Sequence, residues 1–208
     1  MDLSIVVGSC DKYSFLWDKF TKRFNQYWDV DVELKKYLIS ETVDFSGNTF
    51  ETLKCGNVPY TKCLENALES IDSKYILWLQ DDYFLVKKLN SKIIYDSYNL
   101  ISKESNIIRV GIHLDSKYYS TTKHNNTPFN KFSKNSMYSI SMQSSIWDRE
   151  KLLKFLKESP NESPWKFELN GTKRLNMTDY DVFFYKLQDS WYEEAMKKGT
   201  KTKVYYEH

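Results

Sequence analysis

Glycine-rich loops and histidine pairs are scarce in this sequence, and each absence excludes a class of site. The 208 residues include six glycines and three histidines. No glycine belongs to a GxGxxG fingerprint, a GxxxxGK[ST] loop or a GxSxG elbow, which removes the usual dinucleotide, P-loop and serine-hydrolase motifs. His113, His124 and His208 lie far apart and outside any HExxH pattern, so a histidine-rich zinc site is not expected.

Cysteines are also few. Cys10, Cys55 and Cys63 form an odd, unpatterned set without a CxxC pair, which predicts a reducing compartment, no disulfide framework and no thiolate zinc site. The segment MDLSIVVGSC has no basic region before a long apolar stretch, so no secretory signal is expected. No apolar run approaches the roughly 20 residues of a membrane helix. We therefore expect a cytoplasmic location; peripheral contact with the inner face of a membrane stays open.

Charge of one sign does not dominate. With 30 basic and 28 acidic residues the formal net charge is +2, which argues against a dedicated nucleic-acid binder. Hydrophobic residues make up 41% of the chain and aromatic residues 16%, as expected of a folded protein rather than a disordered one. The length fits one domain with a substantial core, and no repeat or linker divides residues 1–208.

The first half of the chain alternates predicted strands and helices. Strands are expected over 3–9, 35–41, 74–80 and 107–114, and helices over 13–28, 60–71 and 91–105. This order predicts an α/β fold with an open, mostly parallel, twisted sheet and helices on both faces. Ligands bind beyond the carboxyl ends of the strands in such sheets, so residues that directly follow strands are site candidates.

The second half breaks this alternation. Residues 115–136 are polar and lack a clear period, which predicts an irregular excursion. Further along we expect a strand over 137–147, a helix over 148–159, a loop or short strand over 160–176, a helix over 181–199 that ends at Gly199, and a last strand over 202–208.

Two adjacent carboxylates end the most apolar predicted strand, in the segment YILWLQDDYFL. Burying an unpaired carboxylate costs on the order of several kcal/mol, so a cation or hydrogen-bond donors should stabilise Asp81 and Asp82. Mg²⁺ and Mn²⁺ prefer carboxylate oxygens, and they often take further ligands from the phosphates of a substrate. The pair therefore predicts a metal–pyrophosphate site, with a solvated surface turn as the alternative.

The chain resembles GT-A type glycosyltransferases, particularly those of bacterial capsule and lipopolysaccharide biosynthesis. The resembling segments are IVVGSCDKYSFLWDKF, GNVPYTKCLENALESIDSKYILWLQDDYFL, SISMQSSIWDREKLLKFL and SPWKFELNGTKR. The metal motif departs from the family's Asp-x-Asp, since this chain reads Gln80-Asp81-Asp82. The resemblance implies a Rossmann-like half over 1–114 that binds a nucleotide sugar and an irregular, acceptor-binding half over 115–208.

The resemblance also implies the ligands and the residues that hold them. The donor would be a nucleotide-diphosphate sugar, with a UDP-sugar favoured, and the acceptor a carbohydrate or glycolipid. Mn²⁺ or Mg²⁺ would be held by Asp82 with assistance from Asp81. The predicted nucleotide-binding residues are Ser9, Cys10, Asp11, Tyr13, Glu41, Gln80 and Asp81. For Cys10 the alternative is a small buried core residue.

Glu168 is the candidate general base of an inverting displacement. An acidic residue in this region commonly has that role in the family, and the apolar neighbours of Glu168 would raise its pKa towards a useful range. Trp165 and Trp147 are predicted to stack on a sugar, with core packing as the alternative for Trp147. Gln143 and Arg174 complete the predicted acceptor-side set, and Arg174 could also contact phosphate or remain solvated.

Two other functions stay open. An Asp pair on an α/β sheet also suits metal-dependent phosphoryl or nucleotidyl transfer, which normally requires a third carboxylate or a Lys/Arg cradle near the pair. A non-catalytic sugar-binding domain would have the same fold without turnover.

Overall fold

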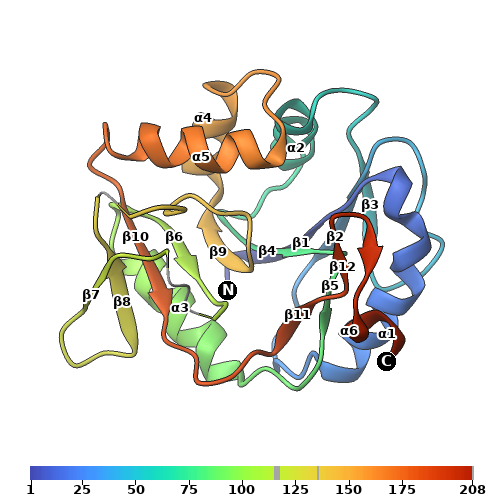
Figure 1. Ribbon diagram of the computed structural model, residues 1–208, viewed down its shortest axis with the longest axis horizontal. Helices are drawn as coiled ribbons and strands as arrows, with labels where there is room; N and C mark the ends of the chain where they lie inside the picture. Colours follow the sequence, from blue (N-terminus) through green and yellow to red (C-terminus); the bar gives the residue numbers. More distant parts are fainter. Residues whose placement is uncertain (115–117, 135, 208) are drawn as a thin grey trace.

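The computed structural model describes residues 1–114, 118–134 and 136–207, and it is built on a nine-stranded sheet with the order β3-β2-β1-β4-β9-β6-β10-β8-β7 (Figure 1). The strands are β1 (Leu3–Gly8), β2 (Lys36–Ser40), β3 (Glu51–Lys54), β4 (Tyr75–Gln80), β6 (Ile107–Gly111), β7 (Thr121–Lys123), β8 (Phe129–Phe132), β9 (Ser145–Asp148) and β10 (Asp181–Tyr185). Strands β9 and β8 run against the neighbours with which they pair, and the remaining neighbours run parallel.

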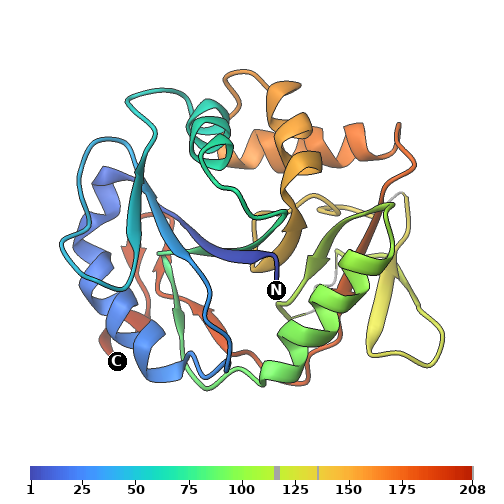
Figure 2. The same cartoon turned by 180° about the vertical axis from the view of Figure 1, so that it is seen from behind.

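Helices cover both faces of this sheet. They are η1 (Asp11–Leu16, a 3₁₀ helix), α1 (Trp17–Tyr27), α2 (Tyr60–Glu69), α3 (Ser91–Lys103), α4 (Arg149–Lys157), α5 (Pro164–Leu175) and α6 (Lys203–Tyr206). Figures 1 and 2 show α2, α4 and α5 on one side of the sheet, with α1 and α3 on the other. No helix in the described part of the chain is long and apolar enough to cross a membrane.

Strand β4 contributes to the core on both faces. Leu77 and Leu79 join the cluster that contains the side chains of α1 and α3, whereas Ile76 and Trp78 join the cluster beneath α2, α4 and α5. Successive side chains of a strand point to opposite faces, so a central strand covered on both sides must be apolar throughout. This explains the uninterrupted apolar run before Gln80 and confirms the predicted α/β class with helices on both faces.

The end of the chain returns to the first half. Strand β11 (Tyr192–Glu194) pairs antiparallel with β5 (Tyr83–Leu85), and β12 (Met196–Lys197) pairs with β13 (Thr200–Lys201). In Figure 1, α6 lies beside α1, and Lys19 Nζ on α1 is 3.1 Å from the carbonyl oxygen of Tyr205. The last part of the supposed acceptor-binding half therefore packs against the first half.

Three sequence predictions in the second half are wrong. Residues 164–175 form α5 rather than a loop, because Ser163 caps the helix and Pro164 occupies its first turn. The predicted helix over 181–199 is instead β10, β11 and β12, and Gly199 adopts φ +79° in the β12–β13 turn. The predicted last strand is α6 within the described residues. A local cap decided the structure of α5, and pairing with other strands decided that of β10, β11 and β12.

Several boundaries also differ from the prediction. The expected strand over 137–147 begins only at β9, the expected strand over 107–114 ends with β6, and the expected helix over 13–28 begins as η1. The polar stretch predicted to be irregular contains the β7–β8 hairpin, although its residues 115–117 and 135 lie outside the described part of the chain. Strands β3 and β5 were not predicted because both are short.

The prediction that the cysteines form no disulfide is wrong. Cys55, just after β3, and Cys63, in the first turn of α2, are disulfide-bonded, with their Cα atoms 4.8 Å apart. The side-chain amide of Asn66 also donates to the carbonyl oxygen of Cys55, at 3.1 Å. The fold brings the two thiols together across a short loop, whereas Cys10 stays free and made the count odd.

Candidate functional site

A cavity of about 280 Å³ lies at the carboxyl ends of β1 and β4. It is lined by Gly8, Ser9, Cys10, Tyr13, Tyr60, Cys63, Leu64, Trp78, Gln80, Asp81, Asp82 and Pro164. A Cβ atom on Gly8 would come within 2.3 Å of the Trp78 ring, so only glycine fits where β1 meets this wall. The cavity is at the sheet edge where the sequence placed the ligand site.

Asp81 is almost fully buried, at 2% exposure, and is fixed by two hydrogen bonds. Its Oδ2 atom accepts from the Ser9 hydroxyl and, at 3.2 Å, from Trp17 Nε1. Trp17 Nε1 also lies 2.7 Å from Ser9 Oγ, so the three side chains form one cluster. Burial, reinforced by the charge of Asp82, raises the pKa of Asp81 to about 8.

Asp82 is held by its backbone, and its carboxylate is less satisfied. Its carbonyl oxygen accepts from Ala195 N at 2.7 Å and from Met196 N at 3.0 Å. Its Oδ1 atom is buried and has no hydrogen-bond partner in the described part of the chain. Burial and the charge of Glu194 raise the pKa of Asp82 to about 6. A partly unsatisfied carboxylate therefore lines the cavity beside a satisfied one.

The two carboxylates fit a divalent cation that takes most of its ligands from phosphate oxygens and water rather than from protein side chains. Within the described ranges, no group of three or more His, Cys, Asp or Glu side chains is arranged to hold a metal, so a preformed protein cage is absent. Mg²⁺ commonly binds proteins through one or two carboxylates and completes its shell with phosphate oxygens and water. Asp82, through the unpartnered Oδ1, and Asp81 beside it match that smaller requirement.

Gln80 is clamped by a residue from the end of the chain. The Tyr192 hydroxyl donates to the Gln80 carbonyl oxygen at 2.6 Å and accepts a hydrogen bond from the Gln80 N–H. The side-chain Oε1 of Gln80 is buried without a partner among the described residues. Tyr192 thus fixes the last residue of β4 directly before the two carboxylates, a contact that no local motif in the sequence signalled.

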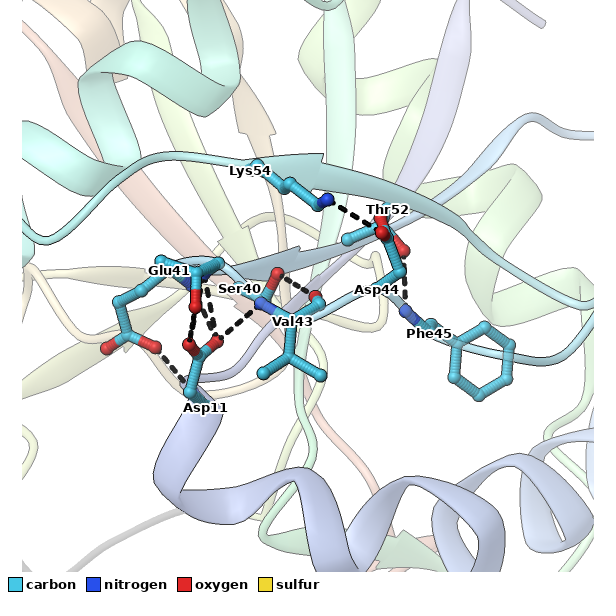
Figure 3. Close-up of polar contacts among 9 residues, drawn as sticks. Asp11, Ser40, Glu41, Val43, Asp44, Phe45, Thr52 and Lys54 are labelled. Carbon is cyan, nitrogen blue, oxygen red and sulfur yellow. Dashed lines mark hydrogen bonds and ion pairs between the residues drawn. The ribbon is translucent and has the colours of Figure 1, made fainter.

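Asp11 and Glu41 bind each other's segments rather than the cavity (Figure 3). The Asp11 carboxylate accepts hydrogen bonds from the backbone N–H groups of Glu41, Thr42 and Val43, at 3.0–3.2 Å, and from the Thr42 hydroxyl. Glu41 Oε2 in turn accepts from the Asp11 N–H. These contacts tie the loop after β1 to the loop after β2, so both side chains shape the wall behind Cys10. Their nucleotide-binding role stays a prediction.

Cys10 and Tyr13 do line the cavity, as a nucleotide-binding loop would. Burial and the charge of Glu41 raise the pKa of the Cys10 thiol, so it stays protonated at neutral pH. Burial and the charge of Asp82 raise the pKa of Tyr13. Tyr60 and Trp78 belong to the same wall, and sequence reasoning missed both because it treated them as helix and core positions.

Glu168 lies on the first half of α5 and is part of the same polar centre. Its Oε1 atom accepts from Met142 N at 2.7 Å and from Ser141 Oγ at 3.2 Å. Burial raises the pKa of Glu168, although these hydrogen bonds and the charge of the fully buried Arg109 oppose the shift. Burial raises the pKa of Tyr60, and the charges of Glu168 and Asp82 add to this shift.

The remaining predicted residues divide into two groups. Trp165 is 67% exposed next to Pro164 of the cavity wall, and Gln143 donates to the Tyr83 hydroxyl at 3.1 Å. Trp147 is fully buried in β9, so the predicted sugar-stacking role is wrong and the core alternative holds. Arg174 forms an ion pair with Glu162, at 3.2 Å, and does not line the cavity.

No family model matches the chain, and no curated protein matches it by sequence. Solved structures do share its fold. S. aureus TarS 1–349 has a TM-score of 0.54 and 11% identity, over 92% of this chain and 60% of TarS 1–349. The complex of TarS 1–349 with UDP-GlcNAc has a TM-score of 0.56 and 13% identity, over 97% and 60%. CMP:2-keto-3-deoxy-manno-octonic acid synthetase, complexed with CTP, has a TM-score of 0.58 and 9% identity, over 99% and 95%.

The chain has a GT-A-like fold. This confirms the fold that the resemblance implied. At these identities the likeness concerns the fold alone, and the chain spans about 60% of TarS 1–349.

Proposed function

We propose that this protein is a metal-assisted glycosyltransferase that uses a nucleotide-diphosphate sugar. The observation that carries the proposal is the cavity beyond β1 and β4, where the carboxylate of Asp82 has a buried oxygen without a partner among the described residues, and where Pro164 of the wall lies one turn of α5 before Glu168. Two of the structures with this fold contain a sugar nucleotide or a nucleotide, UDP-GlcNAc in TarS and CTP in the synthetase. A UDP-sugar is the favoured donor, and a carbohydrate or glycolipid the favoured acceptor.

Different residues of the cavity wall would bind the nucleoside and the diphosphate of the donor. The nucleoside would lie among Ser9, Cys10, Tyr13 and Tyr60, where aromatic faces and a hydroxyl can hold a base and a ribose. The diphosphate would lie at Asp81 and Asp82. Mn²⁺ or Mg²⁺ there would be held by Asp82 with Asp81 beside it, and it would supply neutralisation of the charge on the leaving diphosphate. Trp165, which is 67% exposed and follows Pro164 of the cavity wall, would stack on the sugar.

Glu168 would take the proton of the acceptor hydroxyl. As that oxygen forms its bond to the anomeric carbon, the bond from this carbon to the diphosphate oxygen breaks, and attack from the opposite face inverts the configuration. A carboxylate whose pKa is raised by burial is a stronger base than an exposed one, which suits this role. The hydrogen bonds from Met142 and Ser141 fix its orientation before the substrate arrives.

A second candidate is nucleotidyl transfer, favoured by the likeness to the CTP-bound synthetase over 99% of this chain. A triphosphate carries more negative charge than a diphosphate and usually meets a Lys or Arg cradle. Among the described residues, the cavity wall contains no Lys or Arg side chain. This composition favours a diphosphate donor that relies on the metal for neutralisation.

The two candidates are separated by a ligand panel. We would measure thermal unfolding with UDP-, GDP-, dTDP- and CMP-sugars and with CTP, each with and without Mn²⁺. A ligand at about 100 times its Kd stabilises the folded state by about 2.7 kcal/mol. We expect a Mn²⁺-dependent rise in Tm with a nucleotide-diphosphate sugar and hydrolysis of that sugar on long incubation. Stabilisation by CTP alone, with pyrophosphate release, would favour the nucleotidyltransferase; binding without any turnover would favour a sugar-binding domain.

A further inference from the structure

A second cavity, of about 520 Å³, begins at Tyr83, the residue after Asp82. Its wall also includes Gln143, His113 and the two adjacent carboxylates Glu193 and Glu194 of β11. No residue lines both cavities, so the second cavity is a separate space beside the first. None of the predicted donor-binding residues belongs to it.

Hydrogen bonds connect this second cavity to Glu168. Ser141 Oγ donates to Glu168 Oε1 at 3.2 Å and accepts from Gln143 N at 3.3 Å. Gln143 Nε2 then donates to the Tyr83 hydroxyl at 3.1 Å. Tyr83 directly follows Asp82 in the chain and is the strand partner of Glu194 in the β5–β11 pair. Glu168 itself does not line this cavity, so a molecule bound here would have to extend past Gln143 to reach it.

The charged groups of the wall are acidic. In the part of the chain that the structure describes, no Lys or Arg side chain lines the second cavity. Among the described residues, two cations lie near the wall: Lys197, which is 3.4 Å from Glu194 but 67% exposed and screened by water, and Arg109, which is fully buried next to His113. His113 is uncharged at neutral pH, because burial and the charge of Arg109 lower its pKa to about 3. An anionic group here would meet the acidic residues Glu193 and Glu194, and no cation among the described residues lines the wall beside them.

The other surfaces of the wall suit a sugar ring. Tyr83 and Tyr192 stack with their ring centroids 5.3 Å apart, and both contribute to the wall. Aromatic rings of this kind offer an apolar face to the C–H groups of a sugar. Carboxylates accept hydrogen bonds from hydroxyl groups and bind ammonium groups more strongly still.

We propose that this cavity binds the acceptor, and that the sugar unit bound there is neutral or amine-bearing rather than a uronic acid or a sugar phosphate. The inference rests on the glycosyl transfer proposed above and narrows its acceptor. Discrimination arises from repulsion, since Glu193 and Glu194 disfavour an anion whatever its ring stereochemistry.

The test uses matched p-nitrophenyl glycosides. For each of the gluco, galacto and manno configurations, binding of the neutral glycoside, the 2-amino sugar and the uronide is measured by ligand-detected NMR, with and without UDP and Mn²⁺. We expect the neutral or amino sugar of at least one configuration to bind about tenfold or more tightly than its uronide. The variant Glu193→Gln/Glu194→Gln should reduce this ratio by about tenfold, as loss of partly exposed charges would. Asp31→Asn/Glu33→Gln, at two exposed sites on another loop, removes the same two charges and is the control for net charge.

Each outcome decides the matter. A uronide as the tightest ligand, or a ratio unchanged in the double variant that unfolds like the wild type, overturns the inference. Failure of every sugar to bind while UDP and Mn²⁺ still bind overturns it and leaves the donor site intact. Failure of UDP itself would overturn the proposed function, and the acceptor inference with it. If the double variant fails to fold, each single Glu→Gln variant is measured instead, with the same expected direction.

Discussion

The residues at the carboxyl end of β4 are held by two different parts of the chain, which we call the first side and the second side of the site. On one side, Asp81 is fixed by Ser9 and Trp17, residues of the loop and helices that follow β1. On the other side, Gln80 and Asp82 are fixed by Tyr192, Ala195 and Met196, which arrive from the end of the chain. The first side forms where β1 and β4 pair in parallel within the first half of the chain, whereas the second forms only when β11 pairs with β5. We therefore expect the first side to govern the donor and the second to govern geometry and acceptor.

The largest expected effect is at the base. Glu168→Gln keeps the shape and the hydrogen-bond acceptor but removes the basic carboxylate, so the turnover rate should fall by about 10²–10⁴-fold. Donor affinity should change little, because Glu168 does not line the donor cavity. Single-turnover kinetics and calorimetric titration of UDP measure the two quantities separately. An active Glu168→Gln variant would show that the base is another residue.

Asp82→Asn should separate function from stability. Loss of a metal ligand should reduce Mn²⁺-dependent donor affinity by about 10–100-fold. Because the folded-state pKa of Asp82 is raised to about 6, its contribution favours folding at pH 4 and is lost as the pH rises through 6. Without metal, the Asn variant should therefore be more stable than the wild type at pH 8 by about 2 kcal/mol.

Urea unfolding at pH 5 and pH 8, in the absence of metal, measures this difference. The stability advantage of the variant should be about half as large at pH 5 as at pH 8, because pH 5 lies between the unfolded-state and folded-state pKa values of Asp82. Asp72→Asn, at an exposed position, is the matched control and should show neither effect. An Asp82→Asn variant that is less stable than the wild type at pH 8 would mean that the carboxylate has a protein partner we have not identified.

Removing the disulfide tests whether it holds α2 in place as part of the donor cavity wall. Replacing Cys55 and Cys63 by serine opens a short loop and should lower the free energy of unfolding by about 2–3 kcal/mol. Cys63 lines the donor cavity, so donor affinity should fall as well. Thermal unfolding and UDP titration, with and without a reductant, measure both quantities. Cys10→Ser leaves the disulfide intact and is the control for the unfolding measurement alone, because Cys10 also lines the donor cavity. If the reductant destabilised the wild type and the double variant equally, the disulfide would not be the cause.

The smallest effect is expected for Tyr192→Phe, which tests whether the second side of the site affects turnover more than donor binding. Tyr192→Phe removes the hydroxyl that satisfies both the N–H and the C=O of Gln80, and should cost about 1–3 kcal/mol of stability. Turnover should fall more than donor affinity, because Tyr192 lines the second cavity rather than the first. Tyr95→Phe, which loses one exposed hydrogen bond to Asp31, is the comparison. Similar losses in the two variants would mean that the clamp contributes little.

The sequence predicted the first side of the site well and the second side poorly. Alternating apolar periods located β1, β2, β4 and the helices between them, and the position of Asp81 and Asp82 after β4 followed from that order. The β5–β11 pairing could not be foreseen, because short strands such as Tyr192–Glu194 carry little periodicity and acquire their structure from a distant partner. The same limit hid Tyr192 and turned the predicted helix over 181–199 into strands.

Individual residues show where side-chain chemistry misled the interpretation. Trp147 has the ring expected of a sugar platform, but it lies in the middle of β9 and is fully buried. Asp11 has the carboxylate expected of a ribose ligand, yet it is engaged by the N–H groups of the loop after β2. Glu168 was assigned from its position in the sequence, and its local structure, a helix begun by Ser163 and Pro164, was predicted wrongly.

The central claim is that the unpartnered carboxylate of Asp82 holds a divalent cation together with a nucleoside diphosphate. Titration of Mn²⁺, followed by the loss of the free-ion EPR signal, tests it directly in the presence and absence of UDP. We predict that UDP markedly tightens Mn²⁺ binding to the wild-type protein and that Asp82→Asn abolishes this UDP-dependent binding. Mn²⁺ binding that is independent of UDP, or that is unchanged in Asp82→Asn, would contradict the account.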